Sequence, residues 1–402
     1  MSVTLRTSRP LHCAGLAAAR FIVVGCLTSL ARPLSLAALI FCCLLPAQLR
    51  AAEDFAFLPA VTFDDPASMQ LLDIARAGDR LVAVGERGVI ILSDDHGASW
   101  RQAPVPVSVT LTALHFPRPE LGWAVGHAGV ILHSNDGGES WNLQFDGNAA
   151  NRKYLAWAQR RAQALEEALT ATEDEALLEE LEYALEEAGF AAEDAADAVV
   201  TGPADPFLDV LFLDAHHGYA LGAYGMLYRT SNAGVDWEVA IAGIQNPERF
   251  HYYAITAAAD GRLYLSGEAG LLYSSGDAGD SWERVDDLYD GSLFGVSVRA
   301  GELYAYGLRG HVFRSVDGGV SWAELPNSQR YSLYGGTVLA DGHIVMVGAG
   351  GLVLSSIDGG GLRGWRHPSR SSLSSAVQTA SGDILLVGMA GLLPLSEAEP
   401  LD

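Results

Sequence analysis

Residues 306–322 read YGLRGHVFRSVDGGVSW, and this stretch decides the fold. It contains two glycines three positions apart, then a short apolar run, then an Asp-Gly-Gly turn that ends at Trp322. Glycines at this spacing favour a tight hairpin with positive φ. In the following turn, the short side chain of Asp317 can accept backbone N–H groups. The stretch therefore predicts a hairpin between two strands and an Asp-stabilised turn after the second strand.

The same pattern recurs along the chain with a period of about 40 residues. The glycine pairs fall at positions 85/88, 126/129, 222/225, 267/270, 307/310, 348/351 and 388/391. The turn motif, which begins at Ser or Thr and ends at Trp, is the Asp-box or BNR repeat. Its central side chains are Asp95, Asp136, Asn232, Asp277, Asp317 and, in a degraded sixth copy, Asp358. We interpret these side chains as structural, turn-forming groups and not as catalytic ones.

Apolar residues alternate at period two before each glycine pair, as in RLVAVG (80–85) and HIVMVG (343–348). Such segments predict short β-strands, about four in each repeat. Repeated four-stranded units of this length form a β-propeller. The sequence thus predicts an all-β fold, a seven-bladed propeller of four-stranded blades spanning residues 52–402. The last repeat has no Asp-box, and we expect FAFLPAVTF (55–63) to act as an N-terminal strand that completes blade seven.

One segment interrupts the repeats, residues 147–200, between blades two and three. It is rich in helix formers, and Thr172 with Glu175 resembles a capping box, while Gly189 is suited to a helix end. We predict two antiparallel helices. Residues 151–200 contain 13 acidic and 4 basic residues, so the hairpin is strongly acidic. It is either a solvated decoration of a loop or a docking arm or lid over one propeller face.

Residues 1–51 contain five arginines, no acidic residue and an apolar run at 34–46. This pattern predicts an export signal that is cleaved near Ala51 or Ala52. We therefore expect an exported protein of the periplasm or an equivalent lumen. Retention of the segment as a membrane anchor, or lipidation at Cys26, are the alternatives. All four cysteines lie in this segment, so the remaining chain has no disulfide and no thiolate site.

The charge of the chain excludes several classes of partner and ligand. The formal net charge is -24, and loss of residues 1–51 takes it to -29. Such an acidic protein is poorly suited to nucleic acid, whose phosphates require basic surface. No nucleotide loop, metal-ligand cluster or cofactor motif occurs, so we expect no cofactor and no metal.

Arginines nevertheless concentrate on one predicted face. In a four-stranded blade, the turn between the second and third strands lies on the same face as the connection into the next blade. Arg87 and Arg309 fall in such turns, and Arg249, Arg330 and Arg370 each precede a first strand by the same spacing. Aromatic residues gather nearby at Phe250, His251, Tyr252, Tyr253, Phe294, Tyr331 and Tyr334.

Arginine with tyrosine is a typical composition of a binding hot spot. We predict that a carboxylate-bearing or acidic partner binds here, through Arg87, Arg249, Tyr252, Arg309, Arg330, Tyr331, Tyr334 and Arg370. The alternative is that each arginine pairs with a nearby acid. The acidic hairpin could also occupy this surface when no partner is present, which would make it autoinhibitory.

The glycine pairs followed by DGG-x-SW turns, behind an export signal, resemble the photosystem II stability and assembly factor family of BNR propellers. The resemblance covers about residues 55–402, apart from the helical insertion. It implies a non-enzymatic lumenal or periplasmic scaffold that holds a membrane-protein client, or an exported segment of it, during assembly. It also implies an arginine-rich recognition patch, here Arg249, Arg330 and Arg370. In a non-photosynthetic host the client would be another membrane complex, such as a transporter. We expect a monomer.

Two other functions share the Asp-box. Sialidase-like glycoside hydrolases need an arginine triad, a tyrosine nucleophile with a Glu, and an acid/base Asp. Arg249, Arg330 and Arg370 with Tyr252 or Tyr331 could supply part of that site. The Arg-Ile-Pro motif of sialidases is absent, and those enzymes usually have six blades. A glycan-binding propeller is the third possibility.

Overall fold

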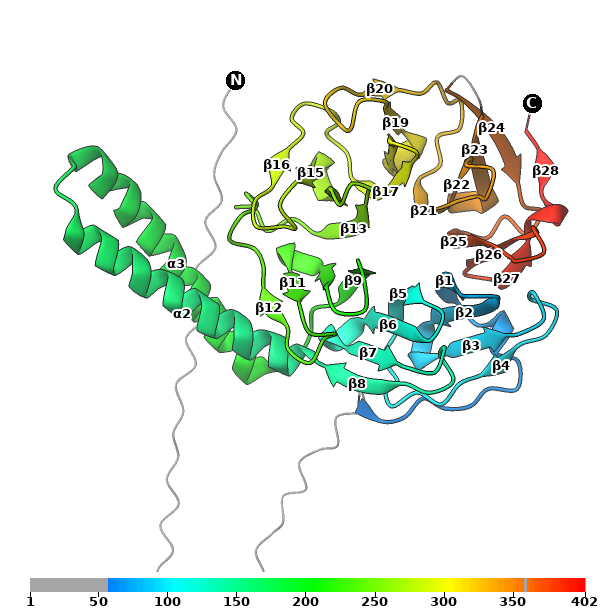
Figure 1. Cartoon of the computed structure of the whole chain (residues 1–402), viewed down its shortest axis with the longest axis horizontal. Coiled ribbons are helices and arrows are strands. Elements are labelled where there is room, and N and C mark those ends of the chain that lie inside the picture. Colours follow the sequence, from blue (N-terminus) through cyan, green and yellow to red (C-terminus); the bar gives the residue numbers. More distant parts are fainter. Residues whose placement is uncertain (1–56, 358–359, 402) are drawn as a thin grey trace, which may run out of the picture. The chain divides into compact units, whose positions relative to one another are not determined.

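The computed structural model describes residues 57–357 and 360–401. Seven antiparallel sheets follow one another along these residues and stand around a ring (Figure 1). The first strands of successive sheets pack against one another, and the first strand of the seventh packs against that of the first. The prediction of a seven-bladed propeller is confirmed. The predicted export signal (1–51) lies outside the described residues.

The strands of each blade run in sequence from the centre of the ring to its rim. Blade one comprises β1 (Leu71–Ala77), β2 (Arg80–Gly85), β3 (Ile90–Ser93) and β4 (Arg101–Gln102). Blade two comprises β5 (Leu111–Arg118), β6 (Leu121–Gly126), β7 (Ile131–Ser134) and β8 (Asn142–Phe145). Blade three comprises β9 (Phe207–Phe212), β10 (Gly218–Gly222), β11 (Leu227–Thr230) and β12 (Glu238–Val239). Blades four and five comprise β13 (Tyr252–Ala257), β14 (Leu263–Gly267), β15 (Leu272–Ser275), β16 (Glu283–Arg284); and β17 (Leu293–Arg299), β18 (Glu302–Gly307), β19 (Val312–Ser315), β20 (Ala323–Glu324). Blades six and seven comprise β21 (Leu333–Val338), β22 (Ile344–Gly348), β23 (Leu352–Ile357), β24 (Gly361–Arg366), β28 (Glu399–Pro400); and β25 (Leu373–Gln378), β26 (Ile384–Gly388), β27 (Gly391–Pro394).

The second strand of each blade is buried on both of its faces. In β2, Val82 belongs to a core cluster with Leu132 of blade two, whereas Leu81 belongs to one with Val387 of blade seven. Successive side chains of this strand therefore pack against different neighbouring blades. This is why the sequence of these strands is almost wholly apolar, although their period is two.

The two glycines of each hairpin have different roles, which corrects the expectation that both supply positive φ. Gly88 does have φ +73°, as has Arg87 before it at φ 57°. Gly85 is extended, at φ −167°. A Cβ there would lie 2.1 Å from the carbonyl oxygen of Gln70, so this glycine is required for close approach of the backbones.

The ring is closed without a strand from the N-terminal segment, and that expectation is wrong for the described residues 57–63. Ala60 N donates to Val105 O at 3.0 Å, so this segment lies along blade one instead. Among the described residues, blade seven has three strands, and the C-terminal strand β28 pairs with β24 of blade six. Packing of β1 against β25 closes the ring, and Ser374 Oγ donates to Leu71 O at 2.9 Å. An alternating apolar segment can satisfy its side chains against either neighbouring blade, so its pattern did not specify the partner.

The Asp-box side chains are hydrogen-bonded within their own turns. In blade four, Ser281 Oγ and N donate to Asp277 at 2.6 and 2.9 Å, and Ser275 Oγ donates at 2.8 Å. These hydrogen bonds, Ser281 first, lower the pKa of Asp277 to about 2. The same turn geometry recurs at Asp95, Asp136, Asn232 and Asp317. Asp358 lies outside the described residues.

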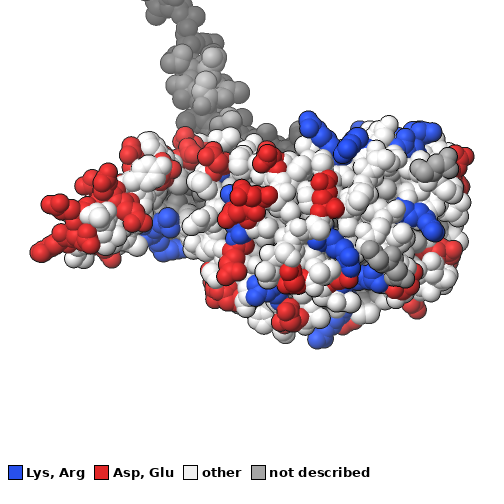
Figure 2. Space-filling model, turned by 90° about the horizontal axis from the view of Figure 1, so that it is seen from above, with Lys and Arg blue, Asp and Glu red and all other residues white. Residues whose placement is uncertain are grey.

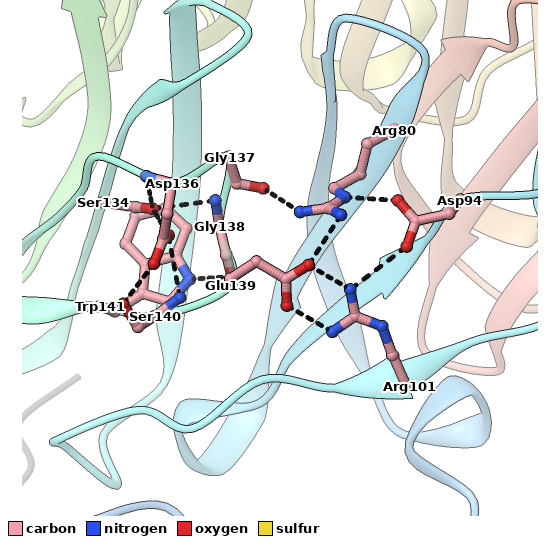
Figure 3. A network of polar contacts seen from close by, with 10 residues as sticks. All are labelled: Arg80, Asp94, Arg101, Ser134, Asp136, Gly137, Gly138, Glu139, Ser140 and Trp141. Atoms are coloured by element: carbon pink, nitrogen blue, oxygen red, sulfur yellow. Dashed lines mark hydrogen bonds and ion pairs between the residues drawn. The ribbon is translucent and has the colours of Figure 1, made fainter.

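The Asp-box turn of blade two also joins two blades through a network of polar contacts (Figure 3). Glu139 lies within the turn, 2.6 Å from Arg101 and 2.7 Å from Arg80, both of blade one. Asp94 of blade one binds the same two arginines, at 2.6 Å to Arg80 and 3.2 Å to Arg101. The charges of Arg80 and Arg101 are thereby neutralised.

The inserted helical hairpin is confirmed, and it projects from the ring between blades two and three (Figure 1). It consists of α2 (Gly147–Ala171) and α3 (Glu175–Thr201), which pack against each other. Neither described helix is both long enough and apolar enough to cross a bilayer.

The predicted ends of the second helix were wrong. Asp174, not Thr172, caps α3 by accepting from Ala176 N at 3.0 Å. The helix continues through Gly189 and ends at Thr201, and the capping residue Gly202 has a φ of 99°, which suits glycine. Packing between the two helices outweighs the low helix propensity of one internal glycine, about 1 kcal/mol.

Candidate interaction surface

One face of the ring is built from the Gly-x-x-Gly turns together with the segments that precede the innermost strands. Backbone hydrogen bonds join the two, as from Leu308 N to Ser292 O and from Ala349 N to Ser332 O, each at 2.9 Å. The predicted arginines lie in these turns and segments. We call this surface the arginine face and define it by Arg87, Arg249, Arg309, Arg330 and Arg370.

All five side chains of the arginine face are exposed. Within residues 57–357 and 360–401, no ion pair involves Arg87, Arg309, Arg330 or Arg370. Arginines near the Asp-box turns are paired instead, as in Arg229 with Asp280 and Arg314 with Glu302. Local neutralisation, the alternative expected from sequence, therefore does not apply to these four. They leave uncompensated positive charge on a protein that is acidic as a whole.

Arg249 differs from the other four because the helical hairpin engages it. Its guanidinium lies 3.5 Å from the carboxylate of Asp194 in α3 and 5.9 Å from the centre of the Tyr154 ring in α2. The hairpin thus contacts one residue of the arginine face, and the autoinhibition hypothesis requires a contact of this kind. The described structure shows no such contact for the remaining four.

The predicted tyrosines divide into one buried and two exposed residues. Tyr252 is only 1% exposed and belongs to the core between blades three and four, so it cannot bind a partner at the surface. Position alone had placed it on the face, but at the start of β13 its side chain turns inward. Tyr331 and Tyr334 are 43% and 41% exposed. Arg366 stacks on Tyr331 at 4.5 Å, which holds that ring in place.

A row of aromatic rings crosses blades three to six on this face. Ring centres are 4.8 Å apart for Tyr224 and His251, 6.3 Å for His251 and Tyr253, 5.0 Å for Tyr253 and Phe294, and 5.5 Å for Phe294 and Tyr334. The register of each innermost strand shifts at its second residue, which is Tyr253, Phe294 or Tyr334 in blades four to six. The bulge at this residue breaks the regular alternation of side chains along the strand, so that these rings line up across the blades.

Sequence reasoning missed two members of this surface. Tyr224 occupies the same turn position as Arg87 and Arg309, with φ 53°, and that equivalence in the repeat could have revealed it. Arg366 is at the end of β24, on a rim strand, and only the tertiary structure brings it over Tyr331.

Two carboxylates inside the ring were also missed. Asp73 accepts from Leu114 N at 3.0 Å, and Asp209 accepts from Ile255 N at 2.8 Å, so each joins its blade to the next. Burial raises the pKa of Asp73 to about 6 and that of Asp209 to about 7. Their hydrogen bonds to backbone identify them as structural groups.

The side chains of the arginine face determine which kind of ligand it can bind. Among the described residues, no cluster of three or more His, Cys, Asp or Glu side chains could hold a metal ion. Exposed guanidinium groups form paired hydrogen bonds with carboxylates, and the neighbouring rings offer apolar contact area. Together they fit a peptide-like ligand that carries a carboxylate and apolar side chains.

Comparison with known families identifies the repeat. Residues 196–291, which contain blades three and four, match the family described as Photosynthesis system II assembly factor YCF48. The resemblance to the photosystem II assembly factors is confirmed. No curated protein matches the chain.

Solved structures support the same fold. The chain is similar to "YCF48 bound to D1 peptide", with 15% identity and a TM-score of 0.56 over 86% of this chain and 100% of that chain. It is also similar to YCF48 from Cyanidioschyzon merolae, with 15% identity and a TM-score of 0.54 over 81% and 95% of the two chains. The WD40 propeller domain of Doa1 matches with 12% identity and a TM-score of 0.53 over 84% and 95%. At such identities the likeness establishes the propeller fold.

Proposed function

We propose that this protein is an exported, non-enzymatic assembly factor that binds a segment of a membrane-protein client through the arginine face. The observation that carries the proposal is the set of four exposed arginines without an ion pair among the described residues, on the same face as the aromatic row. Near the Asp-box turns, Arg80, Arg229 and Arg314 pair with acidic neighbours. Among the described residues, the four arginines of the arginine face have no such pair, which favours an external partner.

The chemistry of the face favours a client segment with carboxylate groups. Arginine binds carboxylates through two parallel hydrogen bonds, which gives geometric specificity as well as affinity. The aromatic row from Tyr224 to Tyr334 would contact apolar side chains of the same segment. A solved structure of similar fold is described as bound to D1 peptide, so a related propeller binds a peptide.

Capture of the client tests this function. The mature protein would be crosslinked in cells and recovered beside the variant Arg309→Ala/Arg330→Ala/Arg370→Ala. The matched control is Arg76→Ala/Arg118→Ala/Arg284→Ala, which removes three exposed arginines elsewhere. We expect one integral membrane protein with the wild type and the control, and its loss with the arginine-face variant. Equal recovery with both variants would contradict the proposed site.

The hydrolase and glycan-binding alternatives make a different prediction for the same experiment. Recovery of no protein partner by any form would favour them, and sialoside and polysaccharide assays would follow. Of the two tyrosines considered for a sialidase-like site, Tyr252 is buried and Tyr331 is exposed, and Arg249 is bound to Asp194.

A further inference from the structure

A groove of about 650 Å³ separates the helical hairpin from blades three and four. Its walls are the inner side of α2 and α3, the turn around Tyr224 and the segment that leads to Arg249. Pockets that bind small molecules and peptide side chains commonly have roughly 300–1,000 Å³. The groove therefore has room for several side chains of a partner.

The groove already holds two cations against aromatic rings. The guanidinium of Arg249 lies 5.9 Å from the Tyr154 ring centre, and that of Arg161 lies 5.8 Å from the Trp157 ring centre. The two rings stack on each other at 5.7 Å. Tyr183, which is 67% exposed, adds a further ring to the wall. These contacts show that the wall accommodates positively charged groups.

Acidic groups remain in excess around this wall. Glu180, Glu187, Asp194 and Asp205 line the groove, and only Asp194 has an ion pair among the described residues. Asp205 is half-buried, and its burial raises the pKa of its carboxyl above the usual range. Arg249 and His251 offset this cost only in part, and an incoming ammonium or guanidinium group would stabilise the ionised carboxylate further.

The hairpin extends this acidic field beyond the groove. From Glu175 to Thr201, α3 carries nine acidic residues and no Lys or Arg. Figure 2 shows acidic side chains covering the projecting end of the hairpin. Such a field attracts positively charged partners and raises their rate of association.

We propose that this groove is a second binding site, which takes a basic segment of a partner protein in which Lys or Arg alternates with apolar side chains. The site goes beyond the proposed function, because its charge preference is opposite to that of the arginine face. Cationic side chains of the partner would lie on Tyr154 and Trp157 and pair with Asp194 and Asp205. Arg249 stands where the partner's cation would bind, so it competes with the partner.

Peptide binding measured by fluorescence anisotropy tests the site. The probe is fluorescein-labelled Lys-Leu-Lys-Phe-Lys-Leu-Lys, and its counterpart has Glu in place of every Lys. Glu180→Gln/Glu187→Gln/Asp194→Asn removes three groove carboxylates. The control Glu179→Gln/Glu186→Gln/Glu193→Gln removes three exposed carboxylates of α3 that do not line the groove. Both variants change the net charge equally, and physiological salt screens diffuse attraction.

We expect saturable binding of the Lys probe alone. The groove variant should lose roughly tenfold in affinity and the control less than about threefold. Trp157→Ala, which changes no charge, should lose about fivefold. Equal losses in the two charge variants, or no saturable binding to the wild type, would overturn the proposal.

Two further variants separate this site from the arginine face. Arg249→Ala should strengthen binding of the Lys probe about threefold, because it removes the competing cation. The variant Arg309→Ala/Arg330→Ala/Arg370→Ala should leave probe affinity unchanged. Loss of client capture with intact probe binding would therefore concern the arginine face alone, and weaker probe binding in Arg249→Ala would contradict the competition.

Discussion

Asp277 illustrates how single residues stabilise the Asp-box turns. Its carboxylate accepts from Ser275 and from both the hydroxyl and the backbone N–H of Ser281. We expect Asp277→Ala to lower the melting temperature, because the turn loses these acceptors. Asp277→Asn should lower it less, since Asn232 holds the equivalent turn of blade three with an amide. Calorimetry would measure both, and an equal loss in the two variants would contradict this account.

Gly348 is required for a different physical reason, the close approach of two backbones. A Cβ at this position would lie 1.9 Å from the carbonyl oxygen of Ser332, although the backbone is extended, at φ −170°. We therefore expect Gly348→Ala to destabilise the fold by about 2 kcal/mol through steric displacement of β21. Urea unfolding would measure this free energy. An unchanged midpoint would mean that the strand shifts without loss.

At the scale of elements, the hairpin helix α3 keeps a glycine in its interior. Nothing lies within 4 Å of a Cβ built on Gly189, so Gly189→Ala adds no clash. We expect it to stabilise the helix by about 1 kcal/mol, because alanine loses less backbone entropy than glycine. Hydrogen exchange of α3 amides would slow accordingly.

Gly202→Ala provides the contrast at the end of the same helix. Its φ of 99° is strained for alanine, so exchange near the end of α3 should become faster. Slower exchange in both variants would argue against the assigned helix end.

For the whole molecule, the interior carboxylates make stability depend on pH. Burial raises the pKa of Asp73 to about 6 and that of Asp209 to about 7, from 3.8. The folded state therefore holds these protons to higher pH than the unfolded chain. Their stabilising effect is complete below about pH 4 and is lost as the pH rises through 6 to 7.

We expect the free energy of unfolding to decrease between about pH 4 and pH 7, by up to about 1.4 kcal/mol per pH unit for each group until the pH reaches its folded-state pKa. Asp209→Asn should weaken this dependence, because the amide accepts from Ile255 N without ionising. Urea titrations across this range would show it. A variant with the same slope as the wild type would contradict the assignment.

The Asp-box carboxylates act in the opposite direction at low pH. Hydrogen bonds, first from Ser99, Ser281 and Ser321, lower the pKa of Asp95, Asp277 and Asp317 to about 2. Their contribution is present above 3.8 and is lost as the pH falls towards 2. Melting temperatures measured at several pH values below about 4 would detect this loss of stability.

The repeat determined the propeller and its seven blades, because Gly-x-x-Gly and the Asp-box are local turn signals that act within a few residues. The run of helix formers at 147–200 determined the inserted helices. The repeat also placed the arginines on one face, since their spacing from each glycine pair fixes their position in the blade. Tertiary structure alone decided which blade residues 57–63 would join, that Tyr252 would turn inward, and that Arg249 would meet Asp194. These outcomes depend on contacts between segments far apart in the sequence, where the competing arrangements satisfy the same local pattern and only packing separates their energies.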